Sequence, residues 1–309
     1  MARIPRGISK ARSETQADKA IRFCQEAGVL RSVGTNRNYR DCLKVVCDYI
    51  REHHLGDLMH ITEKAAVRYL EAKAGTYSQS TLDMHRQSIQ ALMKARGDLP
   101  KDGNLPVVKA VVPEKIVSKH YTPEQVSMVA AAQNGRNGFS TRLAYACGLR
   151  AHEIPTIHRI GEGKAVDLRY YADGTLKALP EKWEGLPDGE RYAVTGKGGL
   201  TREIHVPADL ARELESRRFD EPRTITDRGV LYRDVRYDVA GGQAWSTSFS
   251  KASNRVLGWS TGAHSLRHSY AQARMDELQK RHGYDYSREV VAQELGHFRS
   301  STTDTYIKG

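Results

Sequence analysis

The sequence contains little cysteine, and none of it is arranged for metal binding or for disulfide bonds. Its four cysteines are Cys24, Cys42, Cys47 and Cys147, and no two of them form a Cys-x-x-Cys pair. All four lie among apolar residues at helical spacing, where a free cysteine behaves as a small hydrophobe. We therefore expect neither a structural zinc site nor a disulfide framework.

Long apolar stretches are missing as well. No apolar run approaches the roughly 18 residues that a membrane-spanning helix needs, and the first residues lack the apolar region of a signal peptide. The sequence therefore predicts a cytoplasmic protein with no membrane contact. The glycine-rich residues 196–199 also lack the preceding glycine and the following Ser or Thr of a Walker loop. We expect no bound cofactor.

Positive charge is in excess and is unevenly spread. The 309 residues carry a formal net charge of +11, and residues 1–110 hold 19 Lys and Arg against 12 Asp and Glu. The remaining 29 basic and 25 acidic residues give only +4. The length favours two domains, and the basic first third favours a polyanionic partner for one of them. Solubility is the competing explanation for the charge.

The first hundred residues have the apolar spacing of four helices. Ser13 begins a pattern typical of a capping box, Thr35 and Thr62 are expected to open the second and third helices, and the fourth spans about 80–96. The clearest amphipathic stripe consists of Tyr39, Cys42, Leu43, Val46, Cys47 and Ile50. These periods predict a compact helical bundle over residues 1–110.

Residues 111–120 are expected to form a linker. Prolines alternate with lysines over residues 97–120, and Pro113, Lys115 and Lys119 fall in the linker itself. Such a strip is stiff and extended. It either lies along phosphates or simply joins two domains.

Residues 121–309 are expected to form a second domain that adds a small sheet to its helices. Thr122 opens a capping box with proline at the first helical position. A helix through Leu143, Ala144 and Cys147 then delivers Arg150. Asp173-Gly174 indicates one hairpin turn, and a second hairpin has Lys197 in its turn. Further helices are expected at about 207–217, 248–256, 264–280 and 288–295. The predicted fold class is mostly α with a small β-sheet (α+β).

Five side chains of this domain form a set suited to phosphodiester chemistry. Guanidiniums can grip phosphate oxygens through forked donors, and imidazoles can donate hydrogen bonds or move protons near neutral pH. A tyrosine hydroxyl can attack phosphorus and hold it covalently. The five are Arg150, His264, Arg267, His297 and Tyr306. None of these roles calls for a metal.

Each of these residues also has a plainer explanation. His264 and His268 are four residues apart and could be a metal pair, although no Glu adjoins His264 and no third ligand is evident. Arg150 could interact only with the helix dipole, and Tyr306 is one of 15 tyrosines. The order of the residues, ending in Gly-His and a tyrosine nine residues later, favours the catalytic interpretation.

In this order the residues resemble the tyrosine recombinases, the integrase family of phages, conjugative elements and chromosome-dimer resolvases. The similarity covers about residues 122–306. Gly-Leu-Arg-Ala-His-Glu (148–153) is similar to the first Arg segment of the family, which makes Arg150 catalytic and Glu153 its structural companion. Thr-Gly-Lys-Gly-Gly (195–199) is similar to the Lys hairpin and makes Lys197 the candidate, with Lys182 and Arg202 as alternatives.

The remaining motifs of the family match near the end of the sequence. His264 and Arg267 match the His-x-x-Arg motif, His297 matches the second His, and Tyr306 matches the nucleophile. The resemblance implies a helical core-binding (SAM-like) DNA-binding bundle before the catalytic domain. It also implies transesterification through a 3′-phosphotyrosyl link, with Lys197 protonating the leaving oxygen.

The implied function is site-specific DNA recombination, such as the integration and excision of a mobile element. Its partners would be double-stranded recombination sites, a homotetramer on paired sites and accessory DNA-bending proteins, and the enzyme would be nucleoid-associated. A type IB topoisomerase and a catalytically silent DNA-binding accessory protein are the alternatives.

Two features bear on assembly. Residues 218–245 form a long polar insertion, and only three residues follow Tyr306, too few for a helical turn. We expect a monomer in solution that forms its tetramer only on paired sites, with residues 218–245 as one contact surface. Each subunit is expected to use its own Tyr306.

Overall fold

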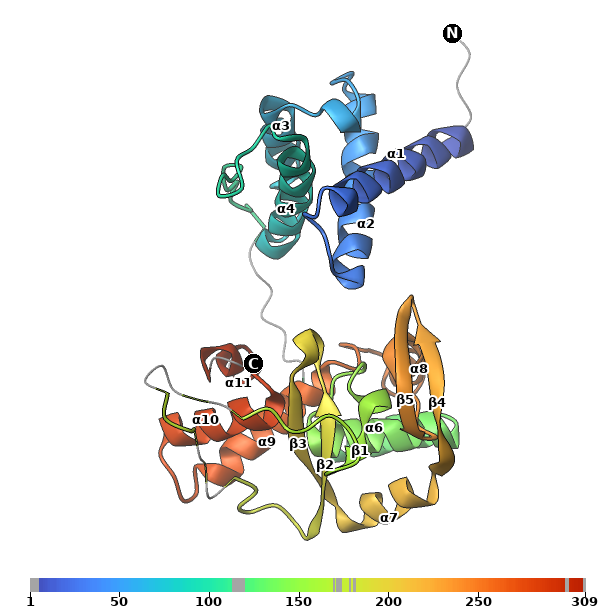
Figure 1. The fold of residues 1–309 in the computed structure, drawn as a ribbon, viewed down its shortest axis with the longest axis vertical. Coiled ribbons are helices and arrows are strands. Elements are labelled where there is room, and N and C mark those ends of the chain that lie inside the picture. The colour runs from blue at the N-terminus through green and yellow to red at the C-terminus, as the bar shows by residue number, and fades with distance from the viewer. Residues whose placement is uncertain are drawn as a thin grey trace. The chain divides into compact units, whose positions relative to one another are not determined.

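The computed structural model describes residues 6–112, 120–168, 170, 174–177, 179, 182–297 and 300–307, and only the backbone of 6–11, 197, 300 and 301. The chain divides into two compact units, Met1–Lys115 and Ile116–Gly309, each with its own hydrophobic core (Figure 1). Among the described helices, none combines the length and apolar character needed to cross a bilayer.

The first unit is helical, as the apolar spacing predicts. Its helices are α1 (Arg6–Glu26), α2 (Val33–Glu52), α3 (Glu63–Lys73) and α4 (Gln79–Arg96), with a short 3-10 turn at Leu58–His60. The stripe on α2 is buried in the core except for Tyr39, which is partly buried. The predicted start at Thr62 is confirmed, because its hydroxyl accepts a hydrogen bond from Ala65 N at 3.2 Å.

The expected capping box at Ser13 is wrong. Helix α1 begins at Arg6, so Ser13 lies inside it and donates a hydrogen bond to Asp48 of α2 at 2.6 Å. Gln16 accepts a bond from Cys47 at 3.2 Å. Residues three apart share one helix face, so the same spacing that suggests a cap places two polar side chains in the helix interface.

The second unit combines seven helices with two small antiparallel sheets among its described residues. The helices are α5 (Pro123–Ala131), α6 (Gly135–Cys147), α7 (Ala208–Ser216), α8 (Gly242–Leu257), α9 (Ser265–Leu278), α10 (Tyr284–Leu295) and α11 (Asp304–Ile307). The strands are β1 (His158–Arg159), β2 (Gly189–Thr195) and β3 (Thr201–Pro207) in one sheet, and β4 (Arg218–Asp227) and β5 (Val230–Tyr237) in the other. Strand β3 contacts α6 and α10, which brings the sheet against the helices that carry the site.

The capping box at Thr122 is confirmed, and the helix that runs through Leu143 to Cys147 and leads to Arg150 is a second one, α6. The Thr122 hydroxyl accepts from Gln125 N, and the Gln125 side chain accepts from Thr122 N at 3.0 Å. Helix α5 ends at Ala131, and Asn134 then caps α6. Asn is a strong N-cap residue, so the chain breaks and restarts the helix there.

The second predicted hairpin is confirmed, with Ala193 of β2 opposite Glu203 of β3. Of the first hairpin the structure shows an antiparallel bridge between Tyr170 and Leu176, whereas Asp173 lies outside the described residues. Residues 113–119 of the expected linker also lie outside them.

The polar insertion at 218–245 forms a hairpin that the sequence did not predict. Strands β4 and β5 pair antiparallel, and the pairing register shifts near Arg223. Arg228 and Gly229 turn the chain with φ of 47° and 79°. Two successive residues in this region match a type I′ turn, whose twist suits a hairpin. The register shifts interrupt the alternation by which a strand is recognised.

Candidate active site

The site begins where α6 ends. Gly148 has φ +58°, and a Cβ there would lie 2.6 Å from the Tyr270 ring, so both conformation and space require glycine. The following turn places Arg150 beside Glu153. The Arg150 guanidinium donates to Oε1 of Glu153 at 2.6 Å, and Arg150 N donates to Oε2 at 2.9 Å. Arg150 is 28% exposed, whereas Glu153 is 1% exposed.

Glu153 is a buried carboxylate shared by three guanidiniums. Arg202 donates to Oε2 at 2.8 Å, and Nη1 of Arg267 lies 3.9 Å from the same oxygen. Burial alone would raise the pKa of Glu153, but the charges of Arg202, Arg267 and Arg150 outweigh burial and hold this pKa at about 2. The cluster therefore carries a surplus of positive charge.

Arg267 ties together the ends of two helices. Its Nη1 donates to the Gly148 carbonyl at 2.5 Å, and its Nη2 donates to the Leu295 carbonyl and to Nε2 of His297, the latter at 3.1 Å. Burial lowers the pKa of Arg267 to about 9, which leaves the guanidinium protonated at neutral pH. Its Nε is buried and has no hydrogen-bond partner among the described residues.

Two hydrogen bonds hold His297 in one tautomer. Its Nε2 accepts from Arg267, so the proton of the neutral ring lies on Nδ1, which is 3.0 Å from the Thr303 hydroxyl. His297 is 4% exposed, and its ring centroid lies 4.9 Å from that of Tyr306. The imidazole thus links the arginine cluster to the segment that carries the tyrosine.

The Tyr306 hydroxyl lies 3.0 Å from Nε2 of His264. The tyrosine ring packs 4.5 Å from the ring of His268, and the Arg267 guanidinium carbon lies 5.6 Å from its centre. The chain therefore brings its predicted nucleophile, both predicted histidines and one predicted arginine to one place.

His264 is in its neutral form at this place. Partial burial of the ring, followed by the positive charges of Arg267 and His268, lowers the pKa of His264. Any lowering from an ordinary value near 6.5 leaves the imidazole neutral at pH 7. A neutral ring can accept the tyrosine proton.

Lys197 is placed by its backbone at the β2–β3 turn, in the short 3-10 segment Lys197–Gly199, and its side chain lies outside the described residues. The turn adjoins the arginine cluster, because a Cβ on Gly196 would lie 2.9 Å from Oε1 of Glu153. The alternative residue Lys182 lies instead over the Trp183 ring, at 4.5 Å.

Arg202, the other alternative, belongs to the buried cluster, a place that the sequence interpretation did not give it. It is 4% exposed and donates to Glu153 and to the backbone carbonyl of Glu294. One signal was available, since Arg202, Ile204 and Val206 alternate along β3 and share its buried face.

A second buried cluster lies on α9 and α10 and was missed. Arg274 donates to both carboxylate oxygens of Glu294, at 3.0 and 2.9 Å, and the Tyr270 hydroxyl donates to Oε2 at 2.9 Å. In this cluster, the one guanidinium, that of Arg274, balances the charge of the one carboxylate, that of Glu294.

Among the described residues, no group of three or more His, Cys, Asp or Glu side chains is arranged to hold a metal ion.

Solved structures that resemble this chain are recombinases and integrases. A lambda integrase tetramer bound to a Holliday junction matches 94% of this chain and 76% of that chain, with a TM-score of 0.55 and 15% identity. A lambda integrase dimer bound to a COC′ core site matches 99% and 81%, with a TM-score of 0.54 and 16% identity. The XerH site-specific recombinase bound to difH substrate matches 88% and 75%, with a TM-score of 0.52 and 18% identity. The sequence itself matches no family model and no curated protein. At these identities, the likeness shows a shared fold.

Proposed function

We propose that this chain, which has the fold of the tyrosine recombinases, cleaves and rejoins DNA strands in site-specific recombination, such as the integration and excision of a mobile element. The observation that carries the proposal is the hydrogen bond between the Tyr306 hydroxyl and neutral His264, beside a cluster with surplus positive charge. A nucleophile, a proton acceptor and an anion site lie together in one chain.

The proposed reaction is a transesterification. The Tyr306 oxygen attacks the scissile phosphorus while its proton passes to Nε2 of His264. The bond from phosphorus to the 5′ oxygen breaks, which gives a 3′-phosphotyrosyl link and a free 5′-hydroxyl. Lys197 supplies the proton for the departing oxygen. The reverse attack by a 5′-hydroxyl rejoins a strand, and the phosphotyrosine conserves the bond energy.

Arg150 and Arg267 stabilise the charge that develops on phosphorus. Arg150 is the more exposed of the two and binds the phosphate from the solvent side, whereas Arg267 is buried and binds it from the protein interior. His297 now accepts from Arg267. When DNA binds, a phosphate oxygen replaces Nε2 of His297 as the acceptor for Arg267. His297 can donate to this phosphate oxygen only after its ring proton moves from Nδ1 to Nε2, or after a second proton binds.

The proposed partners are two DNA duplexes and further copies of the chain. Relatives of this fold have been solved on a recombination substrate and as a tetramer on a Holliday junction. In residues 1–110, basic residues outnumber acidic ones by 19 to 12, which suits contacts to the DNA backbone. We propose that residues 1–110 clamp the DNA, that residues 111–120 form a linker, and that residues 121–309 carry out the chemistry.

Covalent trapping tests the proposal. A duplex selected by the chain from a random pool, and nicked near its cleavage point, should form a denaturant-resistant protein–DNA adduct in buffer containing EDTA. Tyr306→Phe should abolish the adduct and leave DNA affinity within a few-fold. Tyr284→Phe, at a tyrosine that is 46% exposed, is the matched control and should keep it.

Other outcomes separate the alternatives. An adduct that survives Tyr306→Phe would assign the nucleophile elsewhere, and no adduct on any selected duplex would leave a DNA-binding protein without this chemistry. Relaxation of a supercoiled plasmid with no joining of two sites would indicate a topoisomerase.

A further inference from the structure

His152 lies two residues after Arg150 and takes no part in the reaction proposed above. Its side chain is 56% exposed, although its neighbours Arg150 and Glu153 are fixed in the arginine cluster. Glu153 N donates to the Arg150 carbonyl at 2.9 Å, and Gly242 N donates to the Ala151 carbonyl at 2.8 Å. The backbone at His152 is therefore held by its own turn and by the start of α8.

The ring of His152 is held by strands β4 and β5. The Tyr232 hydroxyl forms a hydrogen bond with Nδ1, the two rings lie nearly parallel at 10°, and Oδ2 of Asp227 lies 3.8 Å from Nδ1. Asp227 is itself fixed, because it accepts a bond from Gln243 N at 3.0 Å. When Tyr232 donates to Nδ1, the ring proton lies on Nε2, at the opposite edge of the imidazole.

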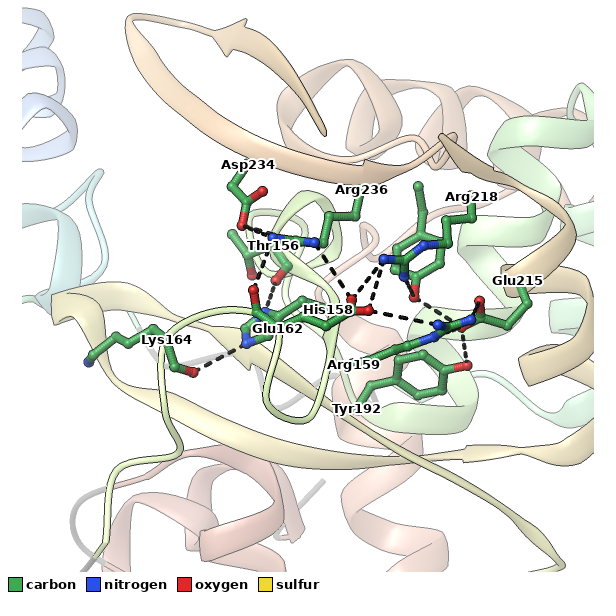
Figure 2. Close-up of polar contacts among 11 residues, drawn as sticks. Thr156, His158, Arg159, Glu162, Lys164, Tyr192, Glu215, Arg218, Asp234 and Arg236 are labelled. Atoms are coloured by element: carbon green, nitrogen blue, oxygen red, sulfur yellow. Dashed lines mark hydrogen bonds and ion pairs between the residues drawn. The ribbon is translucent and has the colours of Figure 1, made fainter. Parts of the chain in front are cut away.

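The base of the same hairpin is fixed by a separate set of contacts (Figure 2). Arg218 donates to both carboxylate oxygens of Glu162, at 3.0 and 2.9 Å, and Arg236 donates to the Glu162 carbonyl at 2.9 Å. The Tyr237 hydroxyl of β5 donates to Glu215 on α7 at 3.0 Å. Figure 1 shows that the hairpin extends to the same side of the second unit as the β2–β3 turn. The hairpin is thus a rigid support for Tyr232.

Because His152 follows Arg150 by two residues, it would lie near the DNA strand that Arg150 is proposed to contact. Two residues span at most about 7 Å, and one DNA strand carries a phosphate about every 3.4 Å along the helix axis. We propose that Nε2–H of His152 donates a hydrogen bond to a phosphate next to the scissile one, with Tyr232 as a positioning residue. This inference rests on the proposed function, since it needs DNA seated at Arg150.

Such a contact strengthens binding and does not take part in the chemistry. A ring oriented in advance loses little conformational freedom when it binds. A single oriented N–H also reaches one phosphate only, so its effect should appear at one position of the DNA, whereas a guanidinium presents several donors. These two consequences distinguish His152 from the arginines beside it.

A scan with neutral phosphates tests the proposal. Single methylphosphonates are placed at each position around the cleavage point of the selected duplex, and the affinity of the full chain is measured for each. The wild type should lose about tenfold at one position beside the scissile phosphate, the size expected for a hydrogen bond to a charged group. His152→Phe should bind the unmodified duplex about tenfold more weakly and lose nothing further at that position.

Two further variants separate the contact from a general effect on folding. His152→Gln keeps a donor near the place of Nε2 and should recover part of the affinity, whereas Tyr232→Phe should reduce the sensitivity at the same single position. His205→Phe alters a histidine of β3 beyond the site and should retain the full wild-type profile.

The results also distinguish this inference from the proposed function. The inference is wrong if His152→Phe keeps the wild-type sensitivity at every position while the wild type forms its adduct. If the wild type binds but forms no adduct, the proposed chemistry fails, and the affinity scan still decides whether His152 contacts a phosphate. If no duplex is bound, both are wrong.

Discussion

Glu153 and Glu294 are both 1% exposed and both bound to arginine, yet the charge around them differs. Glu153 faces three guanidiniums, whereas Glu294 faces one, together with a tyrosine hydroxyl. A balanced pair holds helices together. A cluster with surplus positive charge attracts an anion such as phosphate. Charge balance therefore separates the residues that we assign to substrate from those that hold the fold.

The two clusters are joined through the end of α10. Arg202 of the first cluster donates to the carbonyl of Glu294, and Arg267 donates to the carbonyl of Leu295. The helix that carries the balanced pair therefore also orients two guanidiniums of the unbalanced cluster. These two bonds go to backbone carbonyls and not to the Glu294 carboxylate that Arg274 holds. Side-chain substitutions in the two clusters should therefore affect different properties of the protein.

The largest expected effect is on stability, from Arg274→Met. The change leaves the Glu294 carboxylate buried without a cation, which costs about 3–5 kcal/mol when one partner of a buried pair is removed. Urea unfolding of the second unit measures the loss. The double variant Arg274→Met with Glu294→Gln should recover part of it, because no buried charge then remains. A loss below about 1 kcal/mol would mean that the pair does not hold the fold.

The next effect is a pH dependence of stability at Glu153. The folded pKa of about 2 lies below the ordinary value of 4.5, so the ionised carboxylate stabilises the protein above pH 4.5. This contribution is lost as the pH falls from 4.5 toward 2, and the shift corresponds to on the order of 3 kcal/mol. The stability gap between wild type and Glu153→Gln should shrink across this range. A constant gap would show that the three guanidiniums do not act on Glu153.

Arg150→Ala should act on chemistry with little change in stability. Arg150 is partly exposed, and its loss should slow cleavage about 100-fold or more, as for the loss of a donor to a developing oxyanion. Arg150→Lys should recover little, because a point charge cannot make the forked contact. Single-turnover cleavage measures both. Arg274→Met, assayed where it remains folded, should cleave at nearly the wild-type rate.

The candidate site residues and most helices could be predicted from the sequence, because they depend on local signals. The left-handed glycine at 148, the cap at Thr122 and the His-x-x-Arg spacing can each be recognised within a few residues. The order of these candidate residues along the chain then predicts a common site. The structure brings Tyr306, His264 and His297 together as expected.

The features that were missed depend on residues far apart in the chain. Arg202 and Glu294 are 92 residues apart, and His152 and Tyr232 are 80 apart. The alternation along β3 indicates that Arg202 faces inward, but its partner Glu294 is decided by tertiary packing, which no local pattern reports. The β4–β5 hairpin escaped for another reason, because its register shifts disturb the alternation of a strand.

In the reaction proposed here, one chain completes the whole site, with its own Tyr306 hydrogen-bonded to His264 beside its own arginine cluster. Mixing Tyr306→Phe protein with Arg267→Ala protein on the trapping duplex tests whether the site is completed within one chain. Each variant alone should be inactive. A mixture of Tyr306→Phe protein with wild type is the control that shows whether variant and wild-type subunits assemble on the same DNA. The mixture should remain inactive, because neither chain then holds both residues. Recovered cleavage would contradict the account and show that the tyrosine is delivered to a neighbouring subunit.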